Sequence, residues 1–132
     1  MEMVDMYVIR PTEIETLDVS DREIFKGGSV WQLPLTGGAG KHGKDLTVTN
    51  VQFAAGARTL LHTHTCDQVL YVTAGIGKVA DADGEQIISI GDAAVIPANV
   101  PHWHGASDTG SPFSHLSIML SDSKTTVIKD EI

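Results

Sequence analysis

The stretch GARTLLHTHTCDQVLYVTAG, residues 56–75, carries two histidines one residue apart and an amide four positions later. Side chains alternate between the two faces of a β-strand, so His62 and His64 point the same way, with Cα atoms roughly 6.6 Å apart. Two imidazoles at that separation can converge on one metal ion at about 2.0–2.2 Å. Gln68 has the same parity, so its carbonyl oxygen is a third candidate ligand if the intervening turn keeps register. The stretch therefore predicts a metal site on a strand.

A second pair of histidines lies in PANVPHWHGA, residues 97–106. His102 and His104 are again one residue apart, and we expect both on one face of a strand that follows a turn. Three histidines and an amide oxygen would leave open positions on a six-coordinate ion, as catalytic metal sites do. We predict that His102 completes the ligand set. The alternative is a group of separately hydrogen-bonded core histidines, which would not need this spacing.

The rest of the chain predicts strands rather than helices. Residues 46–53, LTVTNVQF, are rich in β-branched side chains, and turns with Gly, Pro, Asn or Asp recur roughly every 8–12 residues. Asp83-Gly84 separates two apolar runs and is a signal for a two-residue hairpin loop. No capped stretch keeps a 3.6-residue period for more than about two turns. This pattern predicts an all-β sandwich or barrel.

We expect one domain, because the chain has 132 residues. Residues 1–45 are predicted to be an N-terminal arm with one or two short strands and a Gly-rich loop, the loop covering residues 34–44. The barrel core is predicted over residues 46–122 and a C-terminal segment of the same domain over 123–132. Exposed strand edges make a homodimer plausible.

Composition excludes some function classes. Lys and Arg total 9 against 17 Asp and Glu, a formal charge of −8, so a phosphate backbone would be repelled and nucleic acid is not an expected partner. The single cysteine, Cys66, allows no internal disulfide. No signal peptide or bilayer-spanning run is recognisable, so we expect a soluble, cytoplasmic protein that does not bind membranes.

One nucleotide-binding motif is present only in part. Gly38, Gly43 and Lys44 match the start of a phosphate-binding loop, but Asp45 follows where the motif needs Ser or Thr for magnesium. The next residues predict a strand, whereas the motif must open a helix. We interpret this segment as a surface loop, and His42 within it as a solvated side chain.

The histidine segments resemble the two motifs of the cupins. The first, G-x5-H-x-H-x3-E-x6-G, is matched from Gly56 to Gly75, with Gln68 in the glutamate position. The second, G-x5-P-x-G-x2-H-x3-N, is matched at Gly91, Pro97 and His102, while Asn99 replaces the glycine and Ala106 the final asparagine. Asn accepts a left-handed backbone better than most residues, so Asn99 is tolerable. The resemblance implies a single-domain cupin β-barrel, or jelly roll, in which His62, His64, Gln68 and His102 bind one divalent metal.

Within the cupins, the chain resembles the small bacterial enzymes that act as manganese-dependent hydroxynitrile lyases. In that group, as here, glutamine takes the glutamate position, one histidine follows the last ligand and another lies on the final core strand. These two are His104 and His115. The resemblance favours Mn(II) or Fe(II), while imidazole and oxygen ligands also suit zinc and nickel. It implies a lyase acting on a small cyanohydrin or hydroxy-carbonyl compound.

The residues themselves support a proton-transfer role for these two histidines. Alternation places His115 on one face with Phe113, Ser117 and Met119, a mixed pocket lining, so His115 is the first choice as the catalytic proton carrier and His104 the second. The neutral Gln68 would leave the site at a formal +2, which favours Lewis-acid chemistry. Two alternatives stay open, namely a metal-dependent dioxygenase that cleaves a dione or flavonol-like substrate, and a binding protein without turnover.

Overall fold

The computed structural model describes residues 6–37 and 42–129. One 3₁₀ turn, Pro11–Glu13, precedes the strands. The strands are β1 (Leu17–Asp18), β2 (Phe25–Lys26), β3 (Val30–Thr36), β4 (Leu46–Phe53), β5 (Arg58–Thr59), β6 (His62–His64), β7 (Gln68–Asp81), β8 (Gly84–Ser89), β9 (Ala93–Ile96), β10 (Trp103–Gly105), β11 (Phe113–Leu120) and β12 (Thr125–Val127). Among the described residues, no helix is long and apolar enough to cross a membrane.

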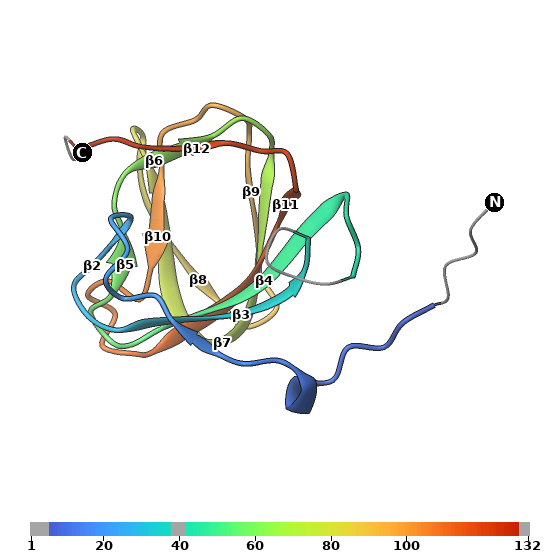
Figure 1. Cartoon of the computed structure of the whole chain (residues 1–132). Coiled ribbons are helices and arrows are strands. Elements are labelled where there is room, and N and C mark those ends of the chain that lie inside the picture. Colours follow the sequence, from blue (N-terminus) through green and yellow to red (C-terminus); the bar gives the residue numbers. More distant parts are fainter. Residues whose placement is uncertain (1–5, 38–41, 130–132) are drawn as a thin grey trace.

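The strands form the all-β barrel that the sequence predicts. The main sheet has the order β1-β3-β4-β11-β7-β10-β5-β2, with β8 and β9 also paired to β7, and β12 pairs with β6 in a separate ribbon. Strands β5 and β10 form one wall, β9 and β11 lie opposite, and β6 with β12 crosses one end (Figure 1). The long β7 therefore joins both walls, and its first residue is the candidate ligand Gln68.

The larger of two buried apolar clusters is built around two phenylalanines, and the smaller one, Leu61, Ala80 and Trp103 with Ile128, lies next to β6 and β12. The rings of Phe53 and Phe113 stack with centroids 6.0 Å apart, and fully buried Val30, Val72 and Ala106 pack in the same cluster. Burying apolar side chains of this size stabilises the fold by roughly 1.5–3 kcal/mol each. This larger cluster packs side chains of β4, β7 and β11 against one another inside the barrel.

The N-terminal segment is part of the barrel wall. Strand β3 pairs with β4 from Val30 to Thr36, and β2 pairs with β5. The prediction of a loop from residue 34 is wrong at its start, because pairing with β4 keeps residues 34–36 in β3. Gly38 of the partial phosphate-binding motif lies outside the described residues, and β4 begins at Leu46 where that motif requires a helix.

Two local predictions can be compared with the backbone. Asn99 has φ +67°, so the left-handed conformation expected at this position is confirmed. The hairpin between β7 and β8 has Ala82 and Asp83 as its loop, one residue earlier than predicted, because Asp81 and Gly84 form the closing pair. The Asp81 carboxylate accepts a hydrogen bond from the Asp83 amide at 2.9 Å, which stabilises this turn.

The outward face of the sheet carries two cross-strand rows without charge. The register aligns them as Leu33–Asn50–Leu116–Tyr71–Ala93 and Thr36–Val48–Ile118–Val69–Val95. Tyr71 and Val95 are exposed, although the chain has a formal charge of −8. The homodimer stays a prediction, and this uncharged face is the surface that a second copy could cover without burying a charge.

Candidate metal centre

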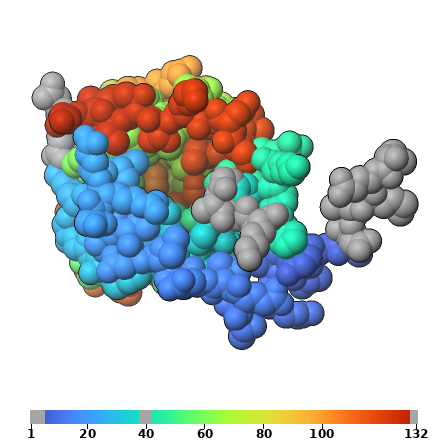
Figure 2. All heavy atoms as spheres, in the orientation of Figure 1, coloured from blue at the N-terminus to red at the C-terminus, as the bar shows by residue number. Residues whose placement is uncertain are grey.

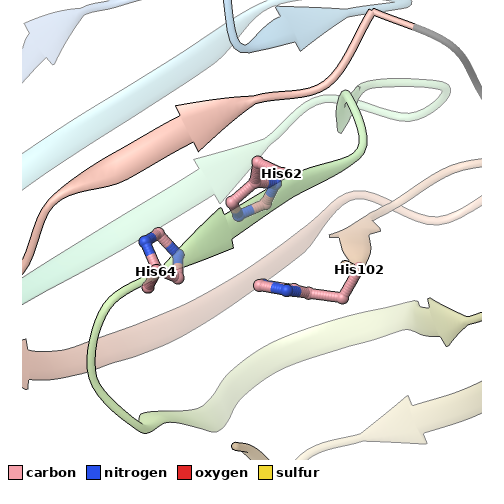
Figure 3. Close-up of side chains that lie close together, drawn as sticks. All are labelled: His62, His64 and His102. Carbon is pink, nitrogen blue, oxygen red and sulfur yellow. The ribbon is translucent and has the colours of Figure 1, made fainter. Parts of the chain in front are cut away.

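Three histidines from two distant segments face one another inside the barrel. His62 and His64 come from β6, and His102 lies beside them just before β10 (Figure 3). The backbones of His62 and His102 exchange two hydrogen bonds, at 2.9 and 3.0 Å, which fixes the segments side by side. Ring nitrogens of all three residues lie within 4.8 Å of one another, and all three side chains are buried. The structure therefore brings these histidines into position to bind a metal ion.

Hydrogen bonds to the outer ring nitrogens determine where the lone pairs point. His62 Nδ1 lies 2.8 Å from the Leu60 carbonyl oxygen and His102 Nδ1 lies 2.9 Å from that of Val100. A carbonyl only accepts, so each Nδ1 carries the hydrogen and each Nε2 keeps its lone pair. His64 Nδ1 contacts the Thr125 hydroxyl at 2.8 Å, and its Nε2 is buried without a hydrogen-bond partner.

Gln68 adds an oxygen to this set of acceptors. Its Nε2 donates to Ser117 Oγ at 2.9 Å, which turns Oε1 toward His102 Nε2 at 3.2 Å. An amide oxygen and an imidazole lone pair repel each other at this distance unless a cation lies between them. Two ligands bound at right angles at about 2.1–2.2 Å would be about 3 Å apart, so the contact suits a shared metal. The four side chains fit a divalent ion.

Burial keeps the imidazoles neutral, as metal ligands must be. It lowers the pKa of His62 from 6.5 to about 3, with a further contribution from charge repulsion by His102. Burial and the same repulsion lower the pKa of His64 to about 4, and burial also lowers the pKa of His102. At neutral pH all three rings can offer lone pairs.

The same shifts predict how the stability of the metal-free protein depends on pH. Unfolded histidines gain protons as the pH falls through about 6.5, whereas folded His62 and His64 resist protonation until about 3 and about 4. The stabilisation is complete above pH 6.5 and is lost progressively below it. We expect a lower urea midpoint at pH 5.0 than at pH 7.5. An equal or higher midpoint at pH 5.0 would contradict the burial of neutral rings.

A cavity of about 410 Å³ reaches His62, His64 and Gln68 from the protein surface. The space-filling view shows a hollow between the blue N-terminal residues and the red C-terminal residues (Figure 2). Residues of both segments line it, including Ile24 and Phe25 from the N-terminal side and Val127 from β12. Small-molecule sites typically measure about 300–1,000 Å³, so the cavity can hold a small, partly apolar compound.

His104 and His115 form a buried pair on the inner wall of this cavity. His104 Nδ1 and His115 Nε2 lie 3.1 Å apart, and the His104 ring lies 5.4 Å from the ring of His62 between centroids. Burial lowers the pKa of His104 well below 6.5 and that of His115 to about 4. His104 is the nearer of the two to the metal ligands, and His115 contacts them through it.

Arg58 and Cys66, which lie in the first histidine segment, lie apart from this cluster. The Arg58 guanidinium lies 4.1 Å above the Trp103 ring, away from the cavity lining. The half-buried Cys66 contacts the Asp67 carbonyl at 3.1 Å and does not belong to the histidine cluster. Sequence reasoning missed Thr125 and the cavity-lining residues of the N-terminal segment, because nothing local connects them to the motifs.

Comparison with known proteins agrees with the fold. The (R)-mandelonitrile lyase of Granulicella tundricola is 42% identical over 71 residues, which span 52% of this chain and about half (53%) of that enzyme. A cupin-like protein from Thermotoga maritima superposes with a TM-score of 0.70 at 33% identity, covering 80% of each chain. The polyketide cyclase RemF from Streptomyces resistomycificus shares the fold, with a TM-score of 0.79 at 15% identity over 96% of this chain and 88% of its own. The family described as Cupin domain matches residues 49–119, and the chain therefore belongs to the cupin family.

Proposed function

We propose that the chain is a metal-dependent lyase that acts on a small cyanohydrin or a related hydroxy-carbonyl compound. The observation that carries this proposal is the set of acceptors on His62, His64, His102 and Gln68 beside the neutral His104–His115 pair. All of these residues except His102 line one cavity. The partial similarity to an enzyme named (R)-mandelonitrile lyase supports the same substrate class.

The four acceptors would hold one divalent ion, with Mn(II) or Fe(II) favoured and Zn or Ni compatible with the ligands. Such an ion supplies Lewis-acid stabilisation of a developing negative charge on oxygen. Because Gln68 is neutral where the cupin motif has glutamate, the protein neutralises less of the positive charge. This departure favours proton chemistry at a hydroxyl group.

The two remaining histidines can move the proton that the reaction releases. Cleavage of a cyanohydrin removes the hydroxyl proton, breaks the bond to the nitrile carbon, and gives a carbonyl compound and cyanide, which takes up a proton. His104 lines the cavity and can accept the hydroxyl proton, while the 3.1 Å contact lets His115 share the resulting charge. The low pKa of each ring makes it a weak base and a strong acid, so a ring that has accepted the proton releases it readily.

The size of the cavity and its apolar side chains suit a small aromatic or branched substrate, while Arg22 and Glu23 add one charge of each sign to the lining. Apolar side chains of Ile24, Phe25, Val51 and Met119 face the space of about 410 Å³. A mandelonitrile-sized molecule would bury its ring against them and direct its polar carbon toward the histidines.

Turnover of racemic mandelonitrile under argon and under air tests the proposal. After elemental analysis identifies the metal, the loaded protein should release benzaldehyde and cyanide at equal rates in both atmospheres. Consumption of oxygen with a dione or flavonol, and no release of cyanide, would support the dioxygenase instead. Metal-loaded protein that turns over neither substrate class would contradict the assignment as an enzyme and favour a binding protein.

A further inference from the structure

The orientation of the Gln68 side chain depends on a serine that no cupin motif includes. Gln68 begins β7 and Ser117 lies on the adjacent β11, where their side chains meet at 2.9 Å inside the barrel. Only 2% of Gln68 and 8% of Ser117 is exposed, so this hydrogen bond is shielded from bulk solvent. Ser117 points inward on the same face as His115, as strand alternation requires.

The amide has two possible orientations in this environment. In the observed one, Nε2 donates to Ser117 and Oε1 faces the lone pair of His102 Nε2 at 3.2 Å. In the reversed one, Nε2 would donate to His102 Nε2, and the Ser117 hydroxyl would donate to Oε1. A hydroxyl can both donate and accept, so Ser117 satisfies either orientation. Only the observed orientation presents an oxygen to a cation.

We infer that Ser117 is a positioning residue, which holds the Gln68 amide with its oxygen toward the three imidazoles and so sets the affinity for the metal. The inference rests on the proposed metal centre. Glutamate, which occupies this position in the cupin motif, has two equivalent oxygens and needs no such control. The amide of this chain does need it, because one of its two ends cannot bind a cation.

Loss of the Ser117 hydroxyl should destabilise the metal-binding orientation of the Gln68 amide more than the reversed orientation. In Ser117→Ala the observed orientation buries an unpaired NH₂ group, whereas the reversed orientation keeps its bond to His102 and leaves only an under-satisfied carbonyl oxygen. Buried unpaired N–H groups are rarer than under-satisfied carbonyls, which indicates the larger cost. Removing an outer partner of a metal ligand typically lowers metal affinity by about 10–100-fold.

The experiment measures Mn(II) affinity by calorimetry and electron paramagnetic resonance, in two backgrounds. Ser117→Ala should weaken Mn(II) binding by about tenfold or more when Gln68 is present. In the Gln68→Glu background, Ser117→Ala should weaken Mn(II) binding by clearly less, because the two carboxylate oxygens are equivalent and either one can face the metal. Ser114→Ala is the matched control, since Ser114 lies on the same strand and bonds Thr73 at 2.6 Å, away from the ligands. It should leave Mn(II) affinity unchanged.

The outcomes distinguish a failure of the role of Ser117 from a failure of the proposed metal centre. Equal losses in the wild-type and Gln68→Glu backgrounds, or no loss in either, would overturn the positioning role of Ser117. If the wild-type protein binds no divalent metal, the metal centre itself is wrong. Thermal unfolding of each metal-free variant shows whether it is folded, and Ser117→Thr, which keeps the hydroxyl, should restore affinity if the alanine variant unfolds.

Discussion

Replacing His62 with alanine is expected to remove both the bound metal and the activity. His62 has its Nδ1 fixed by the Leu60 carbonyl and its Nε2 beside the ring nitrogens of His64 and His102, so alanine removes one of the three clustered imidazoles. Removing a metal ligand should weaken metal binding more than removing a hydrogen-bond partner of a ligand does. We therefore expect metal affinity to fall by more than about 100-fold. Metal content after dialysis and kcat/KM for mandelonitrile measure the result.

His42→Ala is the matched control for this variant. His42 is exposed and stacks on Tyr7 with ring centroids 3.6 Å apart, so the same substitution there should change neither metal content nor turnover. The backbone hydrogen bonds between His62 and His102 do not involve the deleted ring, and circular dichroism should show an intact barrel. Full activity in a metal-free His62→Ala protein would contradict the proposed function.

Replacing His115 with glutamine should lower kcat/KM by about 10²–10⁴-fold while the metal stays bound. Glutamine can still hydrogen-bond to His104 Nδ1, which lies 3.1 Å from His115 Nε2 in the wild-type protein, but it cannot carry a proton. The ring of His115 is fully buried and packs against both Phe53 and Phe113, so a side chain of similar volume also limits the damage to packing.

The pH profile separates a proton carrier from a structural residue. If His104 and His115 share the proton, the pH dependence of kcat/KM should change in His115→Gln, and His104→Gln should lose at least as much activity. A variant with normal metal content, an unchanged pH profile and unchanged kcat/KM would show that His115 only packs against His104.

The sequence predicts those parts of the site that depend on strand alternation. His62 and His64 share a face because they are two residues apart, and His115 shares one with Ser117 and Met119 for the same reason. Parity says which way a side chain points but not how deep it lies. His104, whose position at the rim or in the pocket is open from sequence, is 4% exposed and packs between the ligand rings and His115.

The parts that could not be predicted depend on pairing between distant segments. Strand β2 closes the cavity by pairing with β5, and Thr125 reaches His64 across 61 residues of sequence. Neither segment carries a motif, and short strands of two or three residues have no periodic signal. The loop of the β7–β8 hairpin lies one residue earlier than the predicted Asp83-Gly84, because the Asp81 side chain stabilises the earlier turn. The preference of a dipeptide for turns does not include such a side-chain hydrogen bond.

Strand β12 lies beyond the segment matched by the cupin family, yet it pairs with β6 along its whole length and gives His64 its hydroxyl partner. A protein trimmed to the matched residues would keep all four ligands and lose the strand that aligns two of them. A truncation that removes β12 should therefore weaken metal binding although every ligand is still present, and metal affinity should be compared only between proteins that keep this strand.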